Sequence, residues 1–295
     1  MPRRAVVASA LVLAALGLVY LPVVVSLVRQ WGGDENYSQG FLVAPFAVLT
    51  LWKSRGALQA LPVQPHRAGL AVVLSGVLLF VLGQFGAELF LTRVSLLVVV
   101  AGCVLYLWGA AHLRHVAFGL LLLLLVIPLP ALVLNRVSFP LQLLASRTAE
   151  VVLTSAGVPV LREGNVLVLP NGALEVAQAC SGIRSLSSLI ALALIIGGGG
   201  KRMLLAALAV PIAVIANAAR VAGTGLAAAW ISPLAAEGVF HTFTGWLMFV
   251  VALVALMGCA RAIDAFKRRS RSAQGFATLL TAGPLKRAAR RWGAS

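Results

Sequence analysis

One cysteine in this sequence stands in surroundings that suit thiol chemistry. Cys180 lies in the polar string Ala-Cys-Ser-Gly-Ile-Arg at 179–184, whereas Cys103 and Cys259 lie inside apolar runs, where a small buried thiol is ordinary. A cysteine near a helix N-terminus and near cations has a lowered thiol pKa, which favours the nucleophilic thiolate. We therefore take Cys180 as the candidate nucleophile.

Two further residues could supply the other parts of acyl transfer. His241 is the candidate acid and base, and Arg220 is the candidate donor to the oxyanion of a tetrahedral intermediate. Asn217 precedes Arg220 by about one helical turn on the same helix face, where it could orient the guanidinium or donate to a substrate. Ser181 is a candidate N-cap, and Arg184 a candidate for support or substrate orientation.

Each of these residues also has an ordinary structural explanation. Cys180 could be an inert small residue, and Arg220 could extend to the membrane interface or bind a lipid phosphate. His241, taken alone, resembles a hydrogen-bonded interfacial histidine. Only their combination favours a catalytic site.

The composition predicts that these residues are carried by a membrane protein. The 295 residues are 61% hydrophobic and 11% charged, with a mean hydropathy of +0.99, whereas soluble domains are about 25% charged. The net charge of +16 comes from short basic segments between apolar runs and from the tail between Lys267 and Arg291. This placement indicates anionic lipids at the cytoplasmic face as partners, and no nucleic acid.

The apolar runs predict an all-α polytopic membrane protein with about eight transmembrane helices. The first run is too long for a signal peptide and is interpreted as a retained anchor. The second is short for a span. The predicted segments are residues 5–28, 40–52, 67–85, 90–110, 115–134, 181–198, 203–229 and 239–261.

The basic loops predict that both termini are cytoplasmic, which puts the polar segment 135–180 outside. Its first part, Asn135 to Ala156, is amphipathic and predicts a helix on the membrane surface. Val158 to Val176 alternates around Asn171-Gly172 and predicts a small extracytoplasmic β-hairpin. In this topology the candidate cysteine, arginine and histidine come from three helices and share one level at the outer boundary.

Three strings in this order resemble the exosortase/archaeosortase family: Ala-Cys-Ser-Gly-Ile-Arg-Ser-Leu at 179–186, Asn-Ala-Ala-Arg-Val at 217–221, and His241 followed by Gly245. The string Asn-Tyr-Ser-Gln-Gly-Phe-Leu-Val at 36–43 is also similar to a family motif. The family often has His at the position of Gln39, so we give Gln39 no catalytic role. The resemblance spans roughly residues 5–265.

The resemblance implies a Cys180, Arg220 and His241 site in a cysteine peptidase or transpeptidase of the inner membrane, with its active site extracytoplasmic. It also implies partners: exported proteins whose C-terminus carries a short motif, a hydrophobic helix and a basic end, as in PEP-CTERM-type tails. Such processing often accompanies exopolysaccharide production. The expected organisation is an exosortase-like membrane domain over 1–265 and a basic cytoplasmic tail over 266–295.

Two other classes of function remain open at this point. The protein could be a non-enzymatic transporter whose Arg220 and His241 line a path, or a scaffold of an exopolysaccharide or secretion system. A metal site is not expected, because His112 and His115 have no acidic or cysteine ligand near them in the sequence. No cofactor is expected either.

Overall fold

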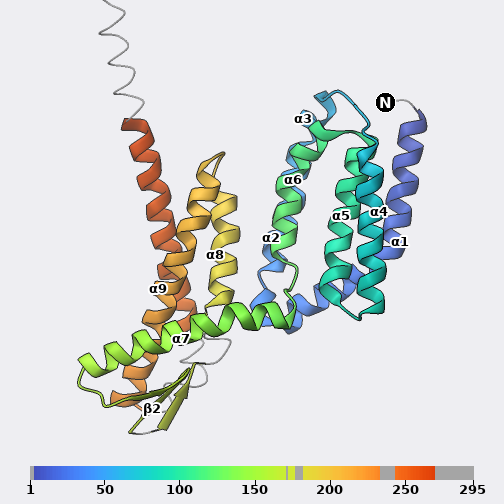
Figure 1. The fold of residues 1–295 in the computed structure, drawn as a ribbon. Helices are drawn as coiled ribbons and strands as arrows, with labels where there is room; N and C mark the ends of the chain where they lie inside the picture. Colours follow the sequence, from blue (N-terminus) through green and yellow to red (C-terminus); the bar gives the residue numbers. More distant parts are fainter. Residues whose placement is uncertain (1–2, 171, 177–181, 233–242, 270–295) are drawn as a thin grey trace, which may run out of the picture.

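The computed structural model describes residues 3–170, 172–176, 182–232 and 243–269, which form a mainly helical chain with one small sheet (Figure 1). The N-terminal part contains α1 (Arg3–Gly33), the 3-10 helix η1 (Glu35–Tyr37), α2 (Gly40–Lys53), α3 (Arg55–Ala60), α4 (Ala68–Phe85), α5 (Leu89–Leu107) and α6 (Ala110–Leu125). The rest contains α7 (Ala131–Ser155), β1 (Leu161–Glu163), β2 (Val166–Leu169), β3 (Gly172–Glu175), α8 (Ile183–Ile196), α9 (Lys201–Trp230) and a C-terminal helix, Phe243–Arg269.

Five of the described helices are long and apolar enough to cross a membrane: α1 over Ala14–Gly33, α4, α5, α9 and the C-terminal helix. The apolar helices α2, α6 and α8 contain only 14, 16 and 14 residues. At a rise of 1.5 Å per residue they reach roughly 21–24 Å, less than the roughly 30 Å of bilayer hydrocarbon. The chain is a multi-pass membrane protein. The prediction of eight spans is not confirmed, because three of the predicted segments form helices shorter than the hydrocarbon layer.

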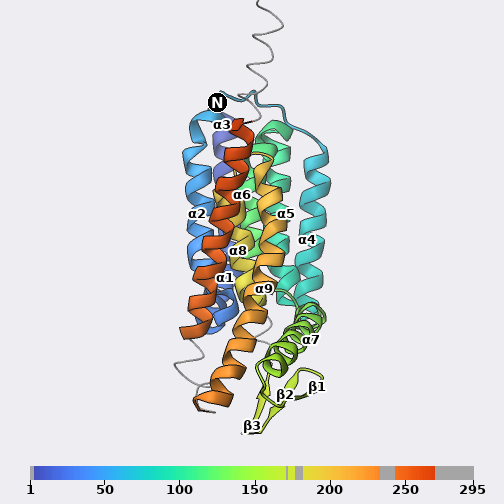
Figure 2. The same ribbon diagram turned by 90° about the vertical axis from the view of Figure 1, so that its left-hand side faces the viewer.

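The predicted segment 115–134 is wrong at its end. The helix α6 stops at Leu125, and α7 begins at Ala131. Pro128 and Pro130 lie between them. Proline has no amide proton for the helical ladder and disfavours a helical residue before it, so two prolines within three residues favour the end of the helix here. The chain turns here, and α7 runs across the ends of the upright helices (Figures 1 and 2).

The helix predicted at 135–156 is confirmed as α7, but the single hairpin after it is a three-stranded antiparallel sheet in the order β1-β2-β3. The prediction missed the turn between β1 and β2, where Gly164 adopts a φ of 65° that favours glycine. In the second hairpin Leu169 pairs with Gly172, which confirms strands on both sides of residue 171. Asn171 itself lies outside the described residues.

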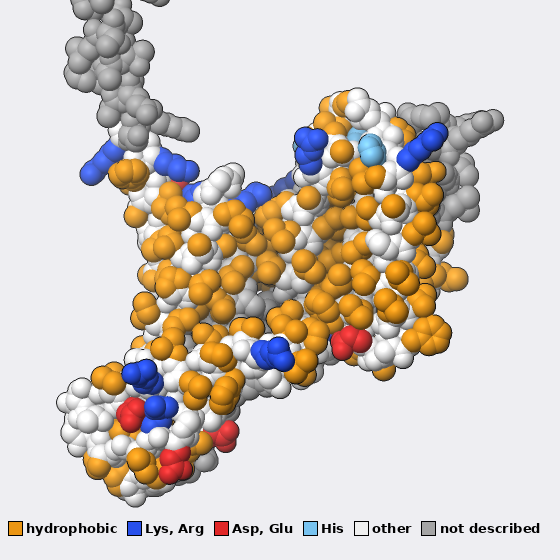
Figure 3. Space-filling model, viewed as in Figure 1, with side chains coloured by type: hydrophobic (Ala, Val, Ile, Leu, Met, Phe, Trp, Pro, Cys, Tyr) orange, Lys and Arg blue, Asp and Glu red, His pale blue; other side chains and the backbone are white. Residues whose placement is uncertain are grey.

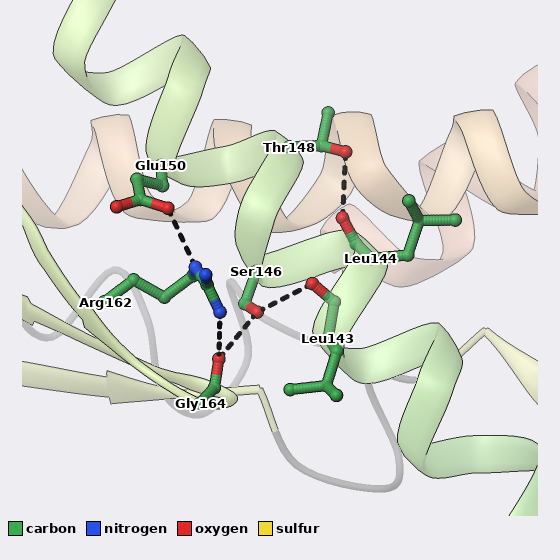
Figure 4. Close-up of polar contacts among 7 residues, drawn as sticks. All are labelled: Leu143, Leu144, Ser146, Thr148, Glu150, Arg162 and Gly164. Atoms are coloured by element: carbon green, nitrogen blue, oxygen red, sulfur yellow. Dashed lines mark hydrogen bonds and ion pairs between the residues drawn. The ribbon is translucent and has the colours of Figure 1, made fainter.

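Polar contacts attach this sheet to α7 (Figure 4). The Nε of Arg162 donates to Oε2 of Glu150 at 2.8 Å, and its Nη1 donates to the carbonyl oxygen of Gly164 at 3.0 Å. The buried hydroxyl of Ser146 donates to the same carbonyl at 3.0 Å. The first strand and its turn are therefore fixed to α7.

Apolar side chains complete the attachment and bring in α9. Leu153 of α7, Leu167 and Val176 of the sheet segment, and Val221 and Ala222 of α9 belong to one buried cluster. Burial of these side chains holds the sheet against the C-terminal half of α9. The sheet and α9 thus form one packed unit.

A second cluster holds α9 between α8 and the C-terminal helix. It contains Ala193 of α8, Ala209 and Ala213 of α9, and Ala252 and Leu256 of the C-terminal helix. Small side chains let helix backbones approach closely in membranes, where packing replaces the hydrophobic effect as the driving force. The alanines therefore explain why these three helices stay together.

A third cluster joins α8 to the N-terminal helices. Ala191 and Leu194 of α8 pack with Val43 and Ala47 of α2 and with Leu122 of α6. These contacts connect the two groups of upright helices visible in Figure 1, with α8, α9 and the C-terminal helix on one side and α1 to α6 on the other.

Charged side chains lie mainly at the two ends of the helix bundle (Figure 3). At one end, Lys201 forms an ion pair with Asp264 at 2.6 Å, and the guanidinium of Arg202 lies 3.8 Å from the ring centre of Phe118. The start of α1 and the end of the C-terminal helix lie at this same end (Figure 1). The sheet lies at the opposite end, and hydrophobic side chains cover the surface between them.

Candidate functional site

The start of α8 packs directly on a polar side chain of α9. Gly182 is the N-cap of α8 and has the left-handed conformation, with φ 80° and ψ 0°. A Cβ atom placed on Gly182 would lie 2.9 Å from Cγ of Asn217. Only glycine combines this backbone conformation with this close approach. Asn217 is 7% exposed, so its amide group is held at the start of α8.

A second glycine brings the C-terminal helix to the same stretch of α9. A Cβ atom placed on Gly245 would lie 3.2 Å from Nη1 of Arg220. The guanidinium of Arg220 therefore lies against the backbone of the C-terminal helix near its beginning. Because Asn217 and Arg220 are three positions apart on α9, the beginnings of α8 and of the C-terminal helix meet α9 within one turn of each other.

The predicted nucleophile, cap and acid/base lie outside the described residues. Cys180 and Ser181 immediately precede Gly182, and His241 precedes the start of the C-terminal helix by two positions. Covalent geometry limits the Cα separation across two peptide units to roughly 7 Å. The described neighbours of the cysteine and the histidine therefore converge on Asn217 and Arg220, the other two residues of the prediction.

The prediction that Ser181 caps α8 is wrong, because the helix begins at Ile183 with Gly182 in the N-cap position and no side-chain cap hydrogen bond. The positive φ of Gly182 turns the chain into the helix instead. Arg184 lies in the first turn of α8 with an exposed side chain, and its carbonyl accepts from the hydroxyl of Ser187 at 3.1 Å.

Gln39, to which the sequence interpretation gave no catalytic role, reaches this region. Its Nε2 donates to the hydroxyl of Ser187 at 2.9 Å, and its Oε1 accepts from the hydroxyl of Ser188 at 3.3 Å. Both serines lie on α8, in the turn after Arg184. The similarity of residues 36–43 to a family motif was the signal for this contact, but it was set aside because the family often has histidine there.

Buried aromatic residues hold the loop that carries Gln39. The indole Nε1 of Trp31 donates to the carbonyl oxygen of Val126 at 2.9 Å, and the hydroxyl of Tyr37 accepts from the amide of Leu129 at 3.1 Å. Burial raises the pKa of the Tyr37 phenol above its ordinary value. The loop between α1 and α2 is thus fixed to the turn between α6 and α7.

The charged side chains of α8 and α9 are all basic. Neither helix contains an aspartate or glutamate, while Arg184 and Arg220 supply positive charge. A nearby cation stabilises a thiolate or an oxyanion relative to its protonated form. Among the residues that the structure describes, no three histidine, cysteine, aspartate or glutamate side chains are grouped to hold a metal ion.

The apolar helices, α7 across their ends and the junction on α9 define a multi-pass membrane protein with a candidate site where three helices meet. A family model described as transmembrane exosortase matches residues 31–258, more than three quarters of the chain. The chain belongs to the transmembrane exosortase family. Comparison with curated proteins and with solved structures gives no significant match.

Proposed function

We propose that this chain is a membrane-embedded cysteine peptidase or transpeptidase that cleaves the C-terminal sorting signals of exported proteins. One observation carries the proposal: Gly182, two positions after Cys180, and Gly245, four positions after His241, pack on side chains of α9 that lie three positions apart. This packing supports a shared site for a thiol, an imidazole and the guanidinium of Arg220.

In the proposed reaction the thiolate of Cys180 attacks the carbonyl carbon of the scissile peptide bond. Arg220 donates hydrogen bonds to the oxyanion that develops, and His241 protonates the amine as the carbon–nitrogen bond breaks. The acyl group then remains on the sulfur as a thioester. Water or an amine attacks this thioester and regenerates the thiolate. Asn217 and Arg184 orient the cation or the substrate.

The proposed location is the outer face of the inner membrane. The end of the bundle with Lys201 and Arg202 is assigned to the cytoplasm, because loops rich in lysine and arginine stay there. The basic residues at this end then bind anionic lipids. The sheet and the α9 junction then face the extracytoplasmic side, where the motif of a substrate tail reaches the site while its apolar helix stays in the bilayer.

The test is to co-express the protein with an exported protein that carries a PEP-CTERM-type tail. We expect the wild type to remove the tail and Cys180→Ala to leave it intact, as read by a mobility shift on an immunoblot. Cys103→Ala is the matched control and should cleave normally, because Cys103 lies within α5. Normal cleavage by Cys180→Ala would overturn the proposal and leave a transporter or a scaffold as the interpretation.

A further inference from the structure

Among the described residues, β3 forms one edge of the sheet and pairs only with β2. The amide of Val176 donates to the carbonyl of Asn165 at 2.8 Å, in continuation of the register in which Glu175 pairs with Val166. Hydrogen-bonded pairs alternate along an antiparallel ladder, so the N–H and C=O groups of Ala173 and Glu175 point away from β2. In the described part of the chain, no residue pairs with them.

The opposite edge of the sheet is tethered to α7 by side-chain contacts. Arg162 on β1 forms an ion pair with Glu150 of α7, and the β1–β2 turn at Gly164 accepts from Ser146. Natural proteins cover or charge the edges of sheets, because an exposed row of backbone groups pairs with other chains. In the described residues β3 is the edge that lacks such a tether, and it therefore offers a surface suited to binding another strand.

The open edge lies close to the proposed site. Val176, directly after β3, is buried in the same cluster as Val221, the neighbour of Arg220 on α9. Cys180 follows Glu175 by five positions, which limits their Cα separation to about 18 Å. A peptide that pairs with β3 is therefore no farther from the candidate nucleophile than a short extended segment can reach.

We propose that this edge binds the extracytoplasmic segment of the substrate by β-strand addition, with the backbone groups of Ala173 and Glu175 as its hydrogen-bond partners. This inference rests on the proposed function and adds the binding mode. The occupant must be an extended polypeptide, because only such a backbone matches the alternating donors and acceptors of an edge strand. The sheet projects beyond the hydrophobic surface in Figure 3, so the bound segment is the aqueous part of the tail, next to the motif.

This binding mode recognises the main chain more than the side chains. Leu174 and Val176 pack toward the protein core, while Ala173 and Glu175 are exposed. Affinity from backbone hydrogen bonds tolerates different sequences, and specificity then comes from pockets for alternate side chains. We therefore expect the segment that pairs with β3 to vary among substrates more than the residues at the scissile bond.

The first test compares Ala173→Pro with Ala173→Val in the full-length Cys180→Ala protein in detergent. Proline removes the outward N–H without breaking a bond to β2, while valine keeps it. The probe is a fluorescent synthetic PEP-CTERM-type tail peptide with its apolar helix, and binding is read by anisotropy. We expect proline to weaken binding about five- to tenfold, the effect of losing one hydrogen bond, and valine to change it less than twofold. Equal affinities for the two variants would overturn the inference.

The second test uses disulfide formation and does not require the sheet to tolerate a proline. Glu175→Cys in the Cys180→Ala background is oxidised with peptides that carry a single cysteine at successive positions. Strand pairing predicts crosslinks at every second position, because side chains alternate between the two faces. Crosslinks without this period, or none, would overturn the inference.

These outcomes separate the binding mode from the catalytic proposal. If wild type fails to cleave tails but binding depends on the open edge, the proposed function fails and the binding mode stands. If Ala173→Pro cleaves and binds normally, the binding mode fails and the proposed function stands. If Ala173→Pro changes only the oligomeric size measured by light scattering, the edge pairs with a second copy of the chain and the inference is overturned.

Discussion

At the residue scale, two glycines determine how closely the helices approach at the candidate site. Gly182 allows α8 to begin against Asn217, and Gly245 allows the C-terminal helix to lie against the guanidinium of Arg220. The two contacts differ in kind. The first meets the Cβ and Cγ atoms near the backbone of α9, and the second meets the far end of a long flexible side chain. Substitutions at the two glycines should therefore have different effects.

We predict that Gly182→Ala lowers the free energy of unfolding by about 1–2 kcal/mol from the left-handed backbone alone, with a further cost from the contact with Asn217. Thermal unfolding in detergent measures the change. Gly198→Ala is the matched control, because a Cβ atom there meets nothing within 4 Å. Gly182→Ala should also slow tail cleavage. Unfolding temperatures that match the wild type would show that Gly182 and Asn217 do not pack as described.

We predict that Gly245→Ala slows cleavage with little loss of stability. The new Cβ atom would lie 3.2 Å from Nη1 of Arg220, so the guanidinium must move by a few tenths of an ångström. Catalysis depends on placing a positive charge at the oxyanion. A displaced donor therefore slows the reaction more than it lowers the free energy of unfolding. Single-turnover cleavage measures the effect, and Gly258→Ala on the same helix is the control, since nothing lies within 4 Å of its Cβ position. Equal rates for the two variants would contradict the assignment of Arg220.

The sequence identified the polar residues of the site but not the glycines that position them. Thiol, guanidinium and imidazole groups are recognisable by type, and Arg220 and Asn217 do face the neighbouring helices. Which glycine has a positive φ or a close neighbour depends on contacts between distant segments. For this reason the cap was assigned to Ser181, a frequent capping residue, although Gly182 fills the position.

At the scale of elements, Gln39 connects the two groups of upright helices. It lies just before α2, and its amide group contacts Ser187 and Ser188 of α8. Hydrogen bonds of this kind contribute more where water is scarce, because the alternative is an unsatisfied polar group. Gln39 thus helps to hold the helix that begins beside Cys180.

We predict that Gln39→Leu lowers the free energy of unfolding by about 1–3 kcal/mol through the loss of two hydrogen bonds, and that it slows cleavage. Gln39→His should retain most of the stability and most of the cleavage rate, because an imidazole can still form a hydrogen bond with one serine hydroxyl. Gln59→Leu, at an exposed position of α3, is the control. Chemical denaturation and the cleavage assay measure the two effects, and a neutral Gln39→Leu would show that this contact is dispensable.

The sequence predicted the positions of most elements, and the errors have local causes. The apolar runs gave the upright helices, and amphipathicity gave α7, because these patterns reflect burial directly. The end of α6 was misplaced because the hydropathy continues through Pro128 and Pro130, whereas the helix ends before this pair of prolines. The extra strand was missed because the turn at Gly164 lacks the strong signal of Asn-Gly. The short helices α2, α6 and α8 are as apolar as spans, so composition could not separate them from full spans.

At the scale of the whole molecule, the two ends of the bundle differ in chemistry. The basic residues near α3 and the start of α9 lie at one end, and the sheet with α7 lies at the other (Figures 1 and 3). The membrane potential and anionic lipids favour the basic end on the cytoplasmic side. The predicted tail over 266–295 begins in the last turn of the C-terminal helix and otherwise lies beyond the described residues.

We predict that single cysteines at the two ends react with an impermeant maleimide on opposite sides of the membrane. Glu163→Cys on β1 should be labelled in spheroplasts, and Gly56→Cys on α3 only after permeabilisation, in a protein whose native cysteines are replaced by alanine. Both positions are exposed. Labelling of both cysteines in intact spheroplasts, or the reverse pattern, would contradict the proposed orientation.

The central claim is that the sulfur of Cys180 carries the acyl group of the substrate. The most direct measurement is rapid acid quenching of the wild-type protein with a synthetic tail peptide, followed by peptide mapping by mass spectrometry. We predict a hydroxylamine-sensitive acyl adduct on the peptide that contains Cys180, and none in Cys180→Ser. Cleavage without an adduct at Cys180, or an adduct at Cys103 or Cys259 instead, would contradict the account.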